Sequence, residues 1–309
     1  MNVARSIGEL PRIWNAFWFA PTDMSAILRV RQSFGILVAL QFAWYLLWVP
    51  DWLSRDGWLD IDAGRYFIGA GMPGTGSQYR WSILYWLTSP SAAQLVCLLG
   101  LLASGLMLFG IGGRLAPLGA WTCMMMVHHR APWLTMPSEV LASAGLLYLA
   151  IAPGLMSARS ASARSASARS ASARSDGENS STTSVLANVA LRCLQVHWLL
   201  WIGWSLASML QQTSWWDGTA IGILSEQGNT WLGKLTRTGW TSQILGFLTI
   251  LLHVASGFCL CNRNLRGLGI LLTAMLGVGY ILLTREALLG LTACCYAMAF
   301  VPYNGTDKI

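Results

Sequence analysis

The chain has 309 residues, of which 54% are hydrophobic and only 11% are charged. A soluble domain carries about a quarter charged residues to keep its surface wetted, so this composition excludes a soluble globule and indicates an integral membrane protein. The net charge of +7 does not indicate a nucleic-acid partner, because the basic residues stand in short segments between apolar runs, where they act as topology signals.

The segment before the first apolar run has the pattern of a helix that lies in the plane of the membrane interface. Its apolar residues recur at helical spacing and charged residues flank them. A helix packed on the cytoplasmic ends of the bundle would show the same pattern, and the two interpretations are compatible. The apolar residues are Leu10, Ile13, Trp14, Phe17 and Trp18, and the flanking ones are Arg5, Glu9 and Arg12.

The rest of the chain is dominated by apolar runs that approach the length of a membrane span, about 20 residues. We expect an all-α, multi-span helical bundle with about eight transmembrane helices. The third and fourth runs are short, and the break "HHRAPWLTMPS" between them would also fit a re-entrant pair. The runs lie at 33–50, 92–111, 115–129, 138–154, 187–211, 241–260, 266–284 and 286–302.

A repetitive stretch, "SARSASARSASARSASARS", separates the two halves of the chain. It holds no apolar residue larger than alanine and cannot bury a core, so disorder is expected. Its arginines would gain about 1 kcal/mol each on anionic lipid head groups, but an expanded linker without a function of its own explains the composition more simply. We therefore predict one half of the membrane domain at 1–156, a linker at 157–186 and the other half at 187–309.

The distribution of basic and aromatic residues predicts the orientation. Arg29 and Arg31 stand immediately before the first run and place that end in the cytoplasm. Tryptophans gather independently at the opposite ends of the runs, as in the aromatic belt of a membrane protein. Both termini are therefore expected on the cytoplasmic side.

Ionisable residues inside apolar runs are candidates for function, because a charge in hydrocarbon costs several kcal/mol. His128, His129 and Arg130 end the third run, and Glu139 opens the fourth. Helical neighbours point about 100° apart, so at most one of the two histidines faces the bundle. An ion pair between Arg130 and Glu139 would be plain structural neutralisation, whereas the functional alternative is a proton-handling or anion-binding pocket that opens outward.

Two further histidines lie deep in later runs. His197 stands about midway along the fifth run and His253 past the middle of the sixth, so the two side chains are close enough in the predicted topology to meet. Such an imidazole binds a polar ligand or relays protons, or it simply donates one hydrogen bond between helices. No nucleotide-binding, zinc-protease or serine-hydrolase motif accompanies them.

Six motifs in order resemble the HTTM (horizontally transferred transmembrane) domain, the membrane domain shared with vitamin K-dependent gamma-glutamyl carboxylases. They cover residues from about 17 to 220. The resemblance implies the same helical membrane fold and, from the family's breadth, a bacterial inner membrane. The motifs are "FWFAPTDMSAILRVRQSFGILVA", "RWSILYW", "FGIGGRLAPLGAW", "HHRAPW", "LANVALRCLQVHWLLWIGWSLA" and "SWWDGTA".

The chain departs from the family at two places. A lysine is typical before the tryptophan turn, in a pattern like K-L-x-G-x-x-W, but here "MLQQTSW" places Met209 at that position and Gln212 where glycine is usual. Methionine offers no titratable proton and cannot replace the lysine. After the His-Arg-x-Pro element, "MPSE" stands where the family often has Asn-Gly-Gly-Asp, and Glu139 keeps the negative charge.

The resemblance together with these departures implies a membrane protein without carboxylase activity. It would bind a lipid or a quinone, or act as a structural or maturation partner of another protein. The residues of the tryptophan turn, Trp215, Trp216 and Asp217, are then the candidates for cofactor binding, and no metal is expected. One alternative is a quinol-dependent oxidoreductase or carboxylase-like enzyme, with acid–base roles for residues among His128, His129, Arg130, Glu139, His197 and His253. The other alternative is a transporter.

Overall fold

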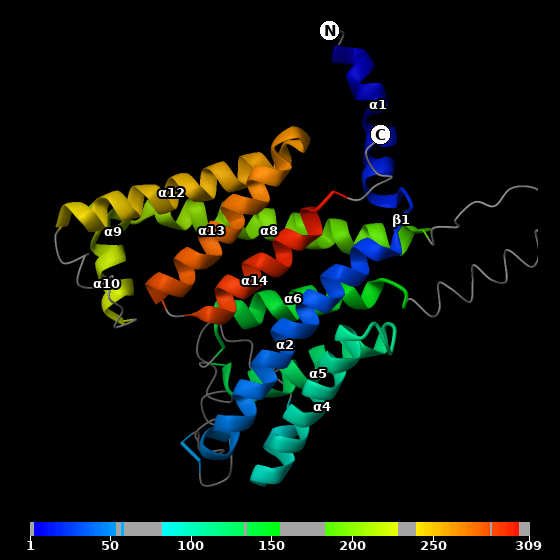
Figure 1. Ribbon diagram of the computed structural model, residues 1–309, viewed down its shortest axis with the longest axis vertical. Helices are drawn as coiled ribbons and strands as arrows, with labels where there is room; N and C mark the ends of the chain where they lie inside the picture. Colours follow the sequence, from blue (N-terminus) through cyan, green and yellow to red (C-terminus); the bar gives the residue numbers. More distant parts are fainter. Residues whose placement is uncertain are drawn as a thin grey trace, which may run out of the picture. The chain divides into compact units, whose positions relative to one another are not determined.

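The computed structural model describes residues 3–53, 57–58, 82–132, 135–154, 183–227, 239–284 and 286–302. In these ranges the regular structure is helical apart from two strands of two residues each, β1 (Thr22–Asp23) and β2 (Thr183–Ser184) (Figure 1). The expected all-α class is therefore confirmed. The predicted disordered linker falls almost entirely outside the described residues.

The helices agree closely with the runs expected from hydropathy. Each of the eight expected runs coincides with one long or medium helix, and short helical turns join some of them. The helices are α1 (Val3–Phe19), α2 (Met24–Leu53), η2 (Ile83–Tyr85), α4 (Pro90–Leu108), α5 (Leu115–Arg130), α6 (Pro137–Ile151), α8 (Val185–Gln211), α9 (Thr213–Trp216), α10 (Thr219–Gln227), α12 (Gly239–Cys261), η4 (Arg263–Leu265), α13 (Arg266–Thr284), α14 (Ala287–Ala297) and η5 (Met298–Phe300).

Five of the described helices, α2, α4, α8, α12 and α13, are long and apolar enough to cross a membrane. This supports an integral membrane protein. The other three runs form α5, α6 and α14, with 16, 15 and 11 residues. A helix of 16 residues is about 24 Å long, shorter than the hydrocarbon core of about 30 Å. The expected number of about eight spans is therefore not confirmed.

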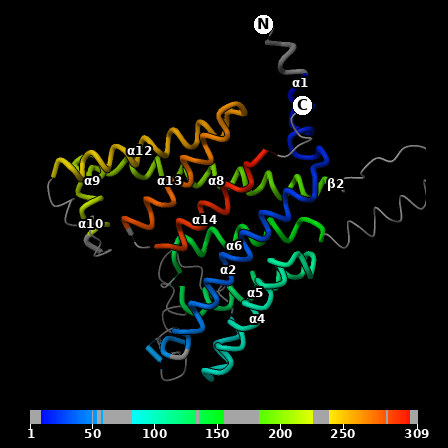
Figure 2. Tube along the Cα trace, viewed as in Figure 1, coloured from blue at the N-terminus to red at the C-terminus, as the bar shows by residue number. Residues whose placement is uncertain are grey.

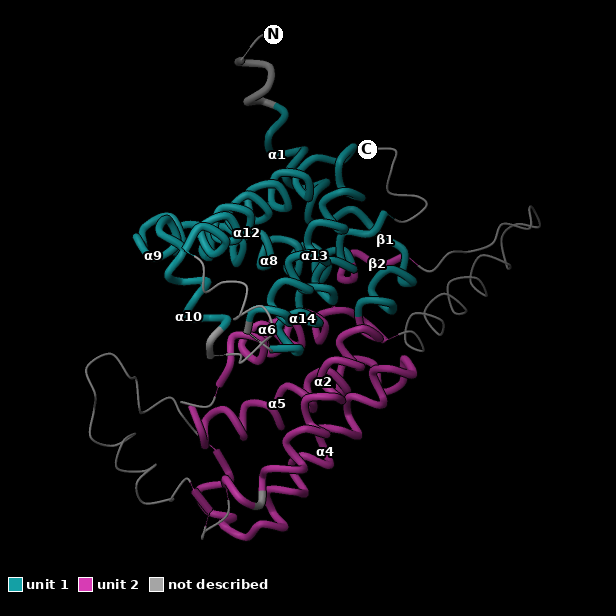
Figure 3. The backbone as a smooth tube through the Cα atoms, turned by 60° about the vertical axis from the view of Figure 1, so that its left-hand side comes forward, with its two compact units in different colours: residues 1–30, 188–309 teal, residues 31–187 magenta. Residues whose placement is uncertain are grey.

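The chain forms two compact units, shown in teal and magenta in Figure 3. Unit 1 comprises residues 1–30 and 188–309, and unit 2 comprises residues 31–187. The amino-terminal helix thus belongs to the same unit as the carboxy-terminal half of the chain.

In unit 2, aromatic rings from one helix pack directly against glycines of the neighbouring helices. A methyl group on Gly100 of α4 would lie 2.3 Å from the ring of Phe42, and one on Gly145 of α6 would lie 2.2 Å from the ring of Phe34. Both phenylalanines come from α2 and are fully buried. Small residues let helices approach closely in an apolar medium, so these two positions fix α2 against α4 and α6.

Two side chains near the start of α2 cap the carboxy-terminal ends of α4 and α6. Arg31 is buried and donates to the carbonyls of Leu149 and Ala152 at 2.9 and 3.1 Å, and Gln32 donates to the carbonyl of Leu108 at 3.2 Å. These carbonyls end α6 and α4, where the helix has no internal donor left. Arg31, expected as a topology signal, is therefore also a structural cap.

Unit 1 is built on α8 and the consecutive helices α12, α13 and α14. Figure 2 shows α12 turning sharply into α13, and η4 makes that turn. Glycines again permit the close approach, since a methyl group on Gly269 would lie 2.7 Å from the backbone nitrogen of Leu260. From α8, Asn188 and Arg192 donate to the last carbonyls of α1 and hold that helix in place.

Candidate functional site

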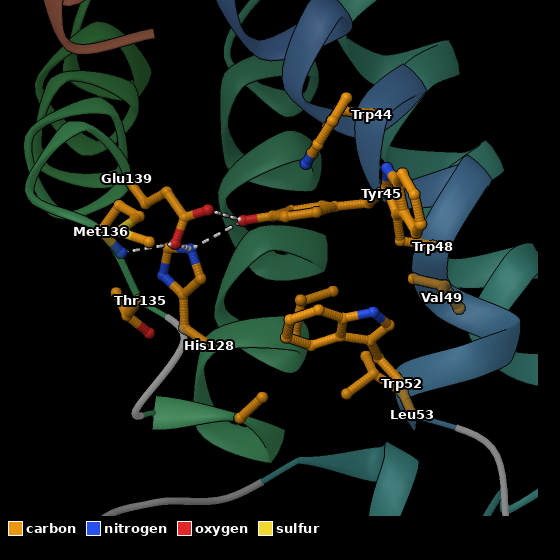
Figure 4. Close-up of a pocket in the computed structure, with 12 residues that line it drawn as sticks. Trp44, Tyr45, Trp48, Val49, Trp52, Leu53, His128, Thr135, Met136 and Glu139 are labelled. Carbon is orange, nitrogen blue, oxygen red and sulfur yellow. Dashed lines mark hydrogen bonds and ion pairs between the residues drawn. The ribbon is translucent and has the colours of Figure 1, made fainter. Parts of the chain in front are cut away.

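A cavity of about 380 Å³ lies in unit 2, where α2 and α5 end and α6 begins (Figure 4). Its walls are mostly apolar, and the polar groups gather at one place. This combination, an apolar cavity with a few converging polar groups, is typical of small-molecule sites. Its lining comprises Trp44, Tyr45, Trp48, Val49, Trp52 and Leu53 from α2, Val127 and His128 from α5, and Ala131, Thr135, Met136 and Glu139 from the segment that follows.

The polar group is centred on Glu139, whose position follows from local sequence. Pro137 begins α6, as proline often does at the first helical position. Glu139 is the third residue of the helix, and its Oε2 accepts from the backbone N–H of Met136 at 3.0 Å. This contact is the carboxylate half of a capping box, and the positive end of the helix dipole favours the negative charge there.

Tyr45 brings α2 into the same group. Its hydroxyl donates a hydrogen bond to Oε1 of Glu139 and accepts from Nε2 of Gln41 at 2.8 Å. Nε2 of His128 lies 3.4 Å from the tyrosine oxygen and 3.4 Å from Oε2 of Glu139. Figure 4 shows the three side chains converging from α2, α5 and α6. Tyr45 and Met136 therefore donate to one carboxylate, Gln41 donates to Tyr45, and the imidazole of His128 lies beside the group.

The opposite part of the lining is a row of tryptophans on α2. Trp44, Trp48 and Trp52 recur every four residues and so lie on one face of the helix. The rings of Trp44 and Trp48 are 5.6 Å apart at 50°. Trp44 and Trp48 remain 55% and 45% exposed, so the tryptophan side of the cavity is not covered by the described part of the chain.

The histidine pair behaves as helical geometry predicts. His128 is buried and borders the cavity, whereas His129 is only half-buried. Arg130 is fully buried, with its guanidinium 5.2 Å from the centre of the Tyr85 ring. The contacts of Glu139 in the structure are with Tyr45, His128 and Met136, and the ion pair with Arg130 stays a prediction.

His253 is engaged on both sides of its ring. Nδ1 lies 2.8 Å from the carbonyl of Thr249, which can only accept, so Nδ1 carries the proton. Nε2 then accepts from the hydroxyl of Tyr280 at 2.8 Å. His253 is 1% exposed. With both nitrogens used inside the bundle, the structure favours the interhelical hydrogen bond over the ligand-binding role.

His197 has a different neighbour from His253. Its ring stacks on Tyr296 of α14 at 5.9 Å, and the adjacent Trp198 stacks on the same tyrosine at 5.3 Å. The described contacts thus place His197 in an aromatic stack with α14 and His253 in a hydrogen bond with α13.

The tryptophan turn is explained by packing. Gly218 has a positive φ of 82°, and a methyl group there would lie 2.5 Å from the backbone nitrogen of Gln243 on α12. Trp216 donates from Nε1 to the carbonyl of Leu210 and packs edge-on against Phe247. This close contact with α12 accounts for the glycine and one tryptophan without a ligand.

Asp217 has a local role in the same turn. Its Oδ1 accepts from the backbone N–H and the hydroxyl of Thr219, at 2.8 and 2.6 Å. These hydrogen bonds stabilise the carboxylate and lower the pKa of Asp217 below its usual value. Both donors belong to Thr219, the first residue of α10, so the side chain stabilises the turn that leads into that helix.

Sequence reasoning missed the aromatic part of the cavity. Tyr45 lies in a long apolar run, where a tyrosine gives little sign of a polar partner. The signal that was available is the four-residue spacing of Trp44, Trp48 and Trp52 with Tyr45 beside them, which indicates an aromatic helix face. Within the described ranges, no three His, Cys, Asp or Glu side chains gather closely enough to share a metal ion.

No protein-family model matches the chain, and no match is found among curated proteins or among solved structures.

Proposed function

We propose that this protein binds an amphipathic small molecule, a lipid or a quinone, in the cavity bordered by Tyr45, His128 and Glu139. The observation that carries the proposal is the separation of the lining into an aromatic, apolar part and one polar group. A ligand with an apolar body and a polar head matches both parts. The volume, about 380 Å³, falls within the roughly 300–1,000 Å³ typical of ligand sites.

We further propose that the chain is related to the HTTM domain and lacks carboxylase activity. The six motifs quoted above support the relationship. Met209, at the position where the family's lysine is expected, is buried in α8 at 7% exposure and has no titratable group. A role as a structural or maturation partner of another protein is compatible with the loss of the lysine.

The proposed arrangement in the membrane has about eight spans, with both termini in the cytoplasm of a bacterial cell and the cavity toward the outer side. The cavity lies at the ends of α2 and α5 and the beginning of α6, which is where this topology puts the outer surface. The short helices α5, α6 and α14 would then cross with the help of the adjoining non-helical residues.

One observation favours a second function, a quinol-dependent oxidoreductase. Tyr45, His128 and Glu139 form a hydrogen-bonded acid–base group beside a cavity, which is the arrangement that proton transfer requires. Among the sequence candidates, His128 and Glu139 fit this role, whereas His253 has no nitrogen left for it.

Native mass spectrometry after gentle purification tests the proposed binding. We expect a retained lipid or quinone that is lost in Tyr45→Phe and kept in Tyr280→Phe, the matched substitution at another half-buried tyrosine that is hydrogen-bonded to a histidine. Equal retention in both variants contradicts the assignment to this cavity. Oxidation of an added quinol by the wild-type protein, abolished in His128→Gln, would instead establish the second function.

Met209→Lys tests the relationship to the carboxylases. We expect no quinol oxidation from this variant, because a single ammonium does not rebuild a lost site. Gained oxidation that depends on Lys at this position would show that the rest of a carboxylase-like site is intact, and it would overturn the proposed loss of function.

A further inference from the structure

The cavity lining carries one kind of formal charge. Among the described residues that border it, Glu139 is the acidic one and none is lysine or arginine. His128 is the single titratable base in that lining. Two donors to the carboxylate of Glu139, the hydroxyl of Tyr45 and the backbone N–H of Met136, are neutral, and the imidazole of His128 lies beside it.

A buried carboxylate gains most from an opposite charge. Neutral donors offset part of the cost of removing it from water, and a cation offsets more. An ionised carboxylate has about four acceptor positions. Tyr45, Met136 and His128 account for three of them in the structure, so acceptor capacity remains for a donor that comes with the ligand.

The aromatic wall favours the same charge. The faces of tryptophan and tyrosine rings are electron-rich, and they attract cations that lie within about 6 Å of the ring centre. Trp44, Trp48 and Trp52 follow one another along α2, and Tyr45 lies beside them with its hydroxyl on Glu139. Aromatic faces together with a carboxylate in one cavity are a combination that attracts ammonium groups.

We propose that the cavity selects amphiphiles with an ammonium head group, such as ethanolamine or choline lipids, whose acyl chains leave past Trp44 and Trp48. This inference rests on the proposed function and names the chemistry of its ligand. The open tryptophan side provides the way out for the chains. A neutral quinone is a poorer match, because its carbonyls only accept hydrogen bonds and would face an acceptor carboxylate.

Lipids that differ only in the head group test this selectivity. The full-length protein in a non-ionic detergent is titrated with phosphatidylethanolamine, phosphatidylcholine and phosphatidylglycerol of identical acyl chains, and the bound fraction is read by native mass spectrometry. We expect the two ammonium lipids to bind roughly tenfold more tightly than the glycerol lipid, from one cation–π and ion-pair site.

Two substitutions localise the effect. Glu139→Gln removes the charge with little change of shape, and Trp48→Leu removes a ring but leaves the hydrogen-bonded group intact. Each should reduce the head-group preference severalfold. The matched controls are Glu9→Gln on α1 and Trp204→Leu on α8, an exposed carboxylate and a 75% exposed tryptophan in unit 1, and both should keep it. Melting temperatures of all four variants establish that each is folded.

Competition with tetramethylammonium separates two sources of the head group. Displacement of the lipid at millimolar concentration shows that a free cation enters the cavity, and failure to displace it shows that acyl chains are required. In either case an ammonium site requires that Glu139→Gln reduces the head-group preference severalfold, and an unchanged preference would refute it.

Two outcomes overturn the inference in different ways. Equal binding of all three lipids, or preferential retention of an added ubiquinone, with loss in Trp48→Leu, would refute the ammonium head group and leave the proposed cavity function standing. Binding that is the same in the wild type, Glu139→Gln and Trp48→Leu would refute both.

Discussion

Unit 1 and unit 2 each hold a buried histidine beside a half-buried tyrosine among apolar helices, but the two pairs differ in what lies next to them. Tyr280 and His253 satisfy each other and a backbone carbonyl. Tyr45 and His128 converge on Glu139 at the edge of a cavity. Burial of a polar group therefore does not by itself make a binding site. The group in unit 2 differs from the group in unit 1 because it borders a cavity with an aromatic lining.

The comparison has a physical basis. A histidine between helices exchanges hydrogen bonds with its neighbours and specifies their packing. A carboxylate at a cavity keeps acceptor capacity that packing does not use. We therefore expect substitutions in the first group to change stability and substitutions in the second to change ligand binding.

The largest effect on stability is expected for His253→Ala. It removes a fully buried ring and leaves the hydroxyl of Tyr280 without this acceptor, which together cost about 2–4 kcal/mol. Thermal unfolding in detergent measures this cost. Ligand retention should stay at the wild-type level at temperatures below the transition. A variant that is stable but loses the ligand would erase the distinction between the two groups.

A double-mutant cycle on Tyr45→Phe and Glu139→Gln is expected to give the next largest effect. A hydrogen bond to a charged group is worth about 1.5–3 kcal/mol, so the two substitutions should be strongly non-additive in the free energy of unfolding. The control cycle pairs Tyr45→Phe with Glu9→Gln. Additivity in the test cycle would mean that the hydrogen bond between hydroxyl and carboxylate contributes nothing to the stability of the folded state.

His128 and His129 offer a finer test, because they are adjacent and only the first borders the cavity. His128→Gln should lower ligand retention severalfold, because the amide does not reproduce the imidazole beside Glu139. His129→Gln should leave it unchanged. The measurement is the bound fraction in native mass spectrometry, and equal losses in the two variants would contradict the described orientation.

Asp217→Asn is expected to have the smallest effect. The side chain is exposed and its hydrogen bonds to Thr219 are local. These bonds lower the pKa of Asp217 in the folded state. Their contribution to the free energy of unfolding is therefore present above the pKa that Asp217 has in the unfolded chain. It is lost as the pH falls through the lower folded-state pKa. A melting temperature that fell well below that of the wild type at neutral pH would indicate a larger role for the turn.

Sequence by itself determined the class of the protein and most of its helices. Hydropathy and helical periodicity depend on residues that are close together in the chain. The apolar runs and the amphipathic α1 therefore follow from local pattern, and so does the burial of His128 but not of its neighbour His129. The capping position of Glu139 after Pro137 belongs to the same category.

Tertiary structure alone decided which polar groups meet. Tyr45 and Glu139 are 94 residues apart, and Arg31 caps a helix end that lies 118 residues further along. No local pattern encodes such a pairing, because it depends on how α2 packs against α5 and α6. In unit 1, the contact of α12 with α13 gave His253 a tyrosine partner, whereas in unit 2 the helix packing left His128 beside a cavity. The composition thus predicts a membrane protein, whereas the site depends on contacts between helices that are far apart in the sequence.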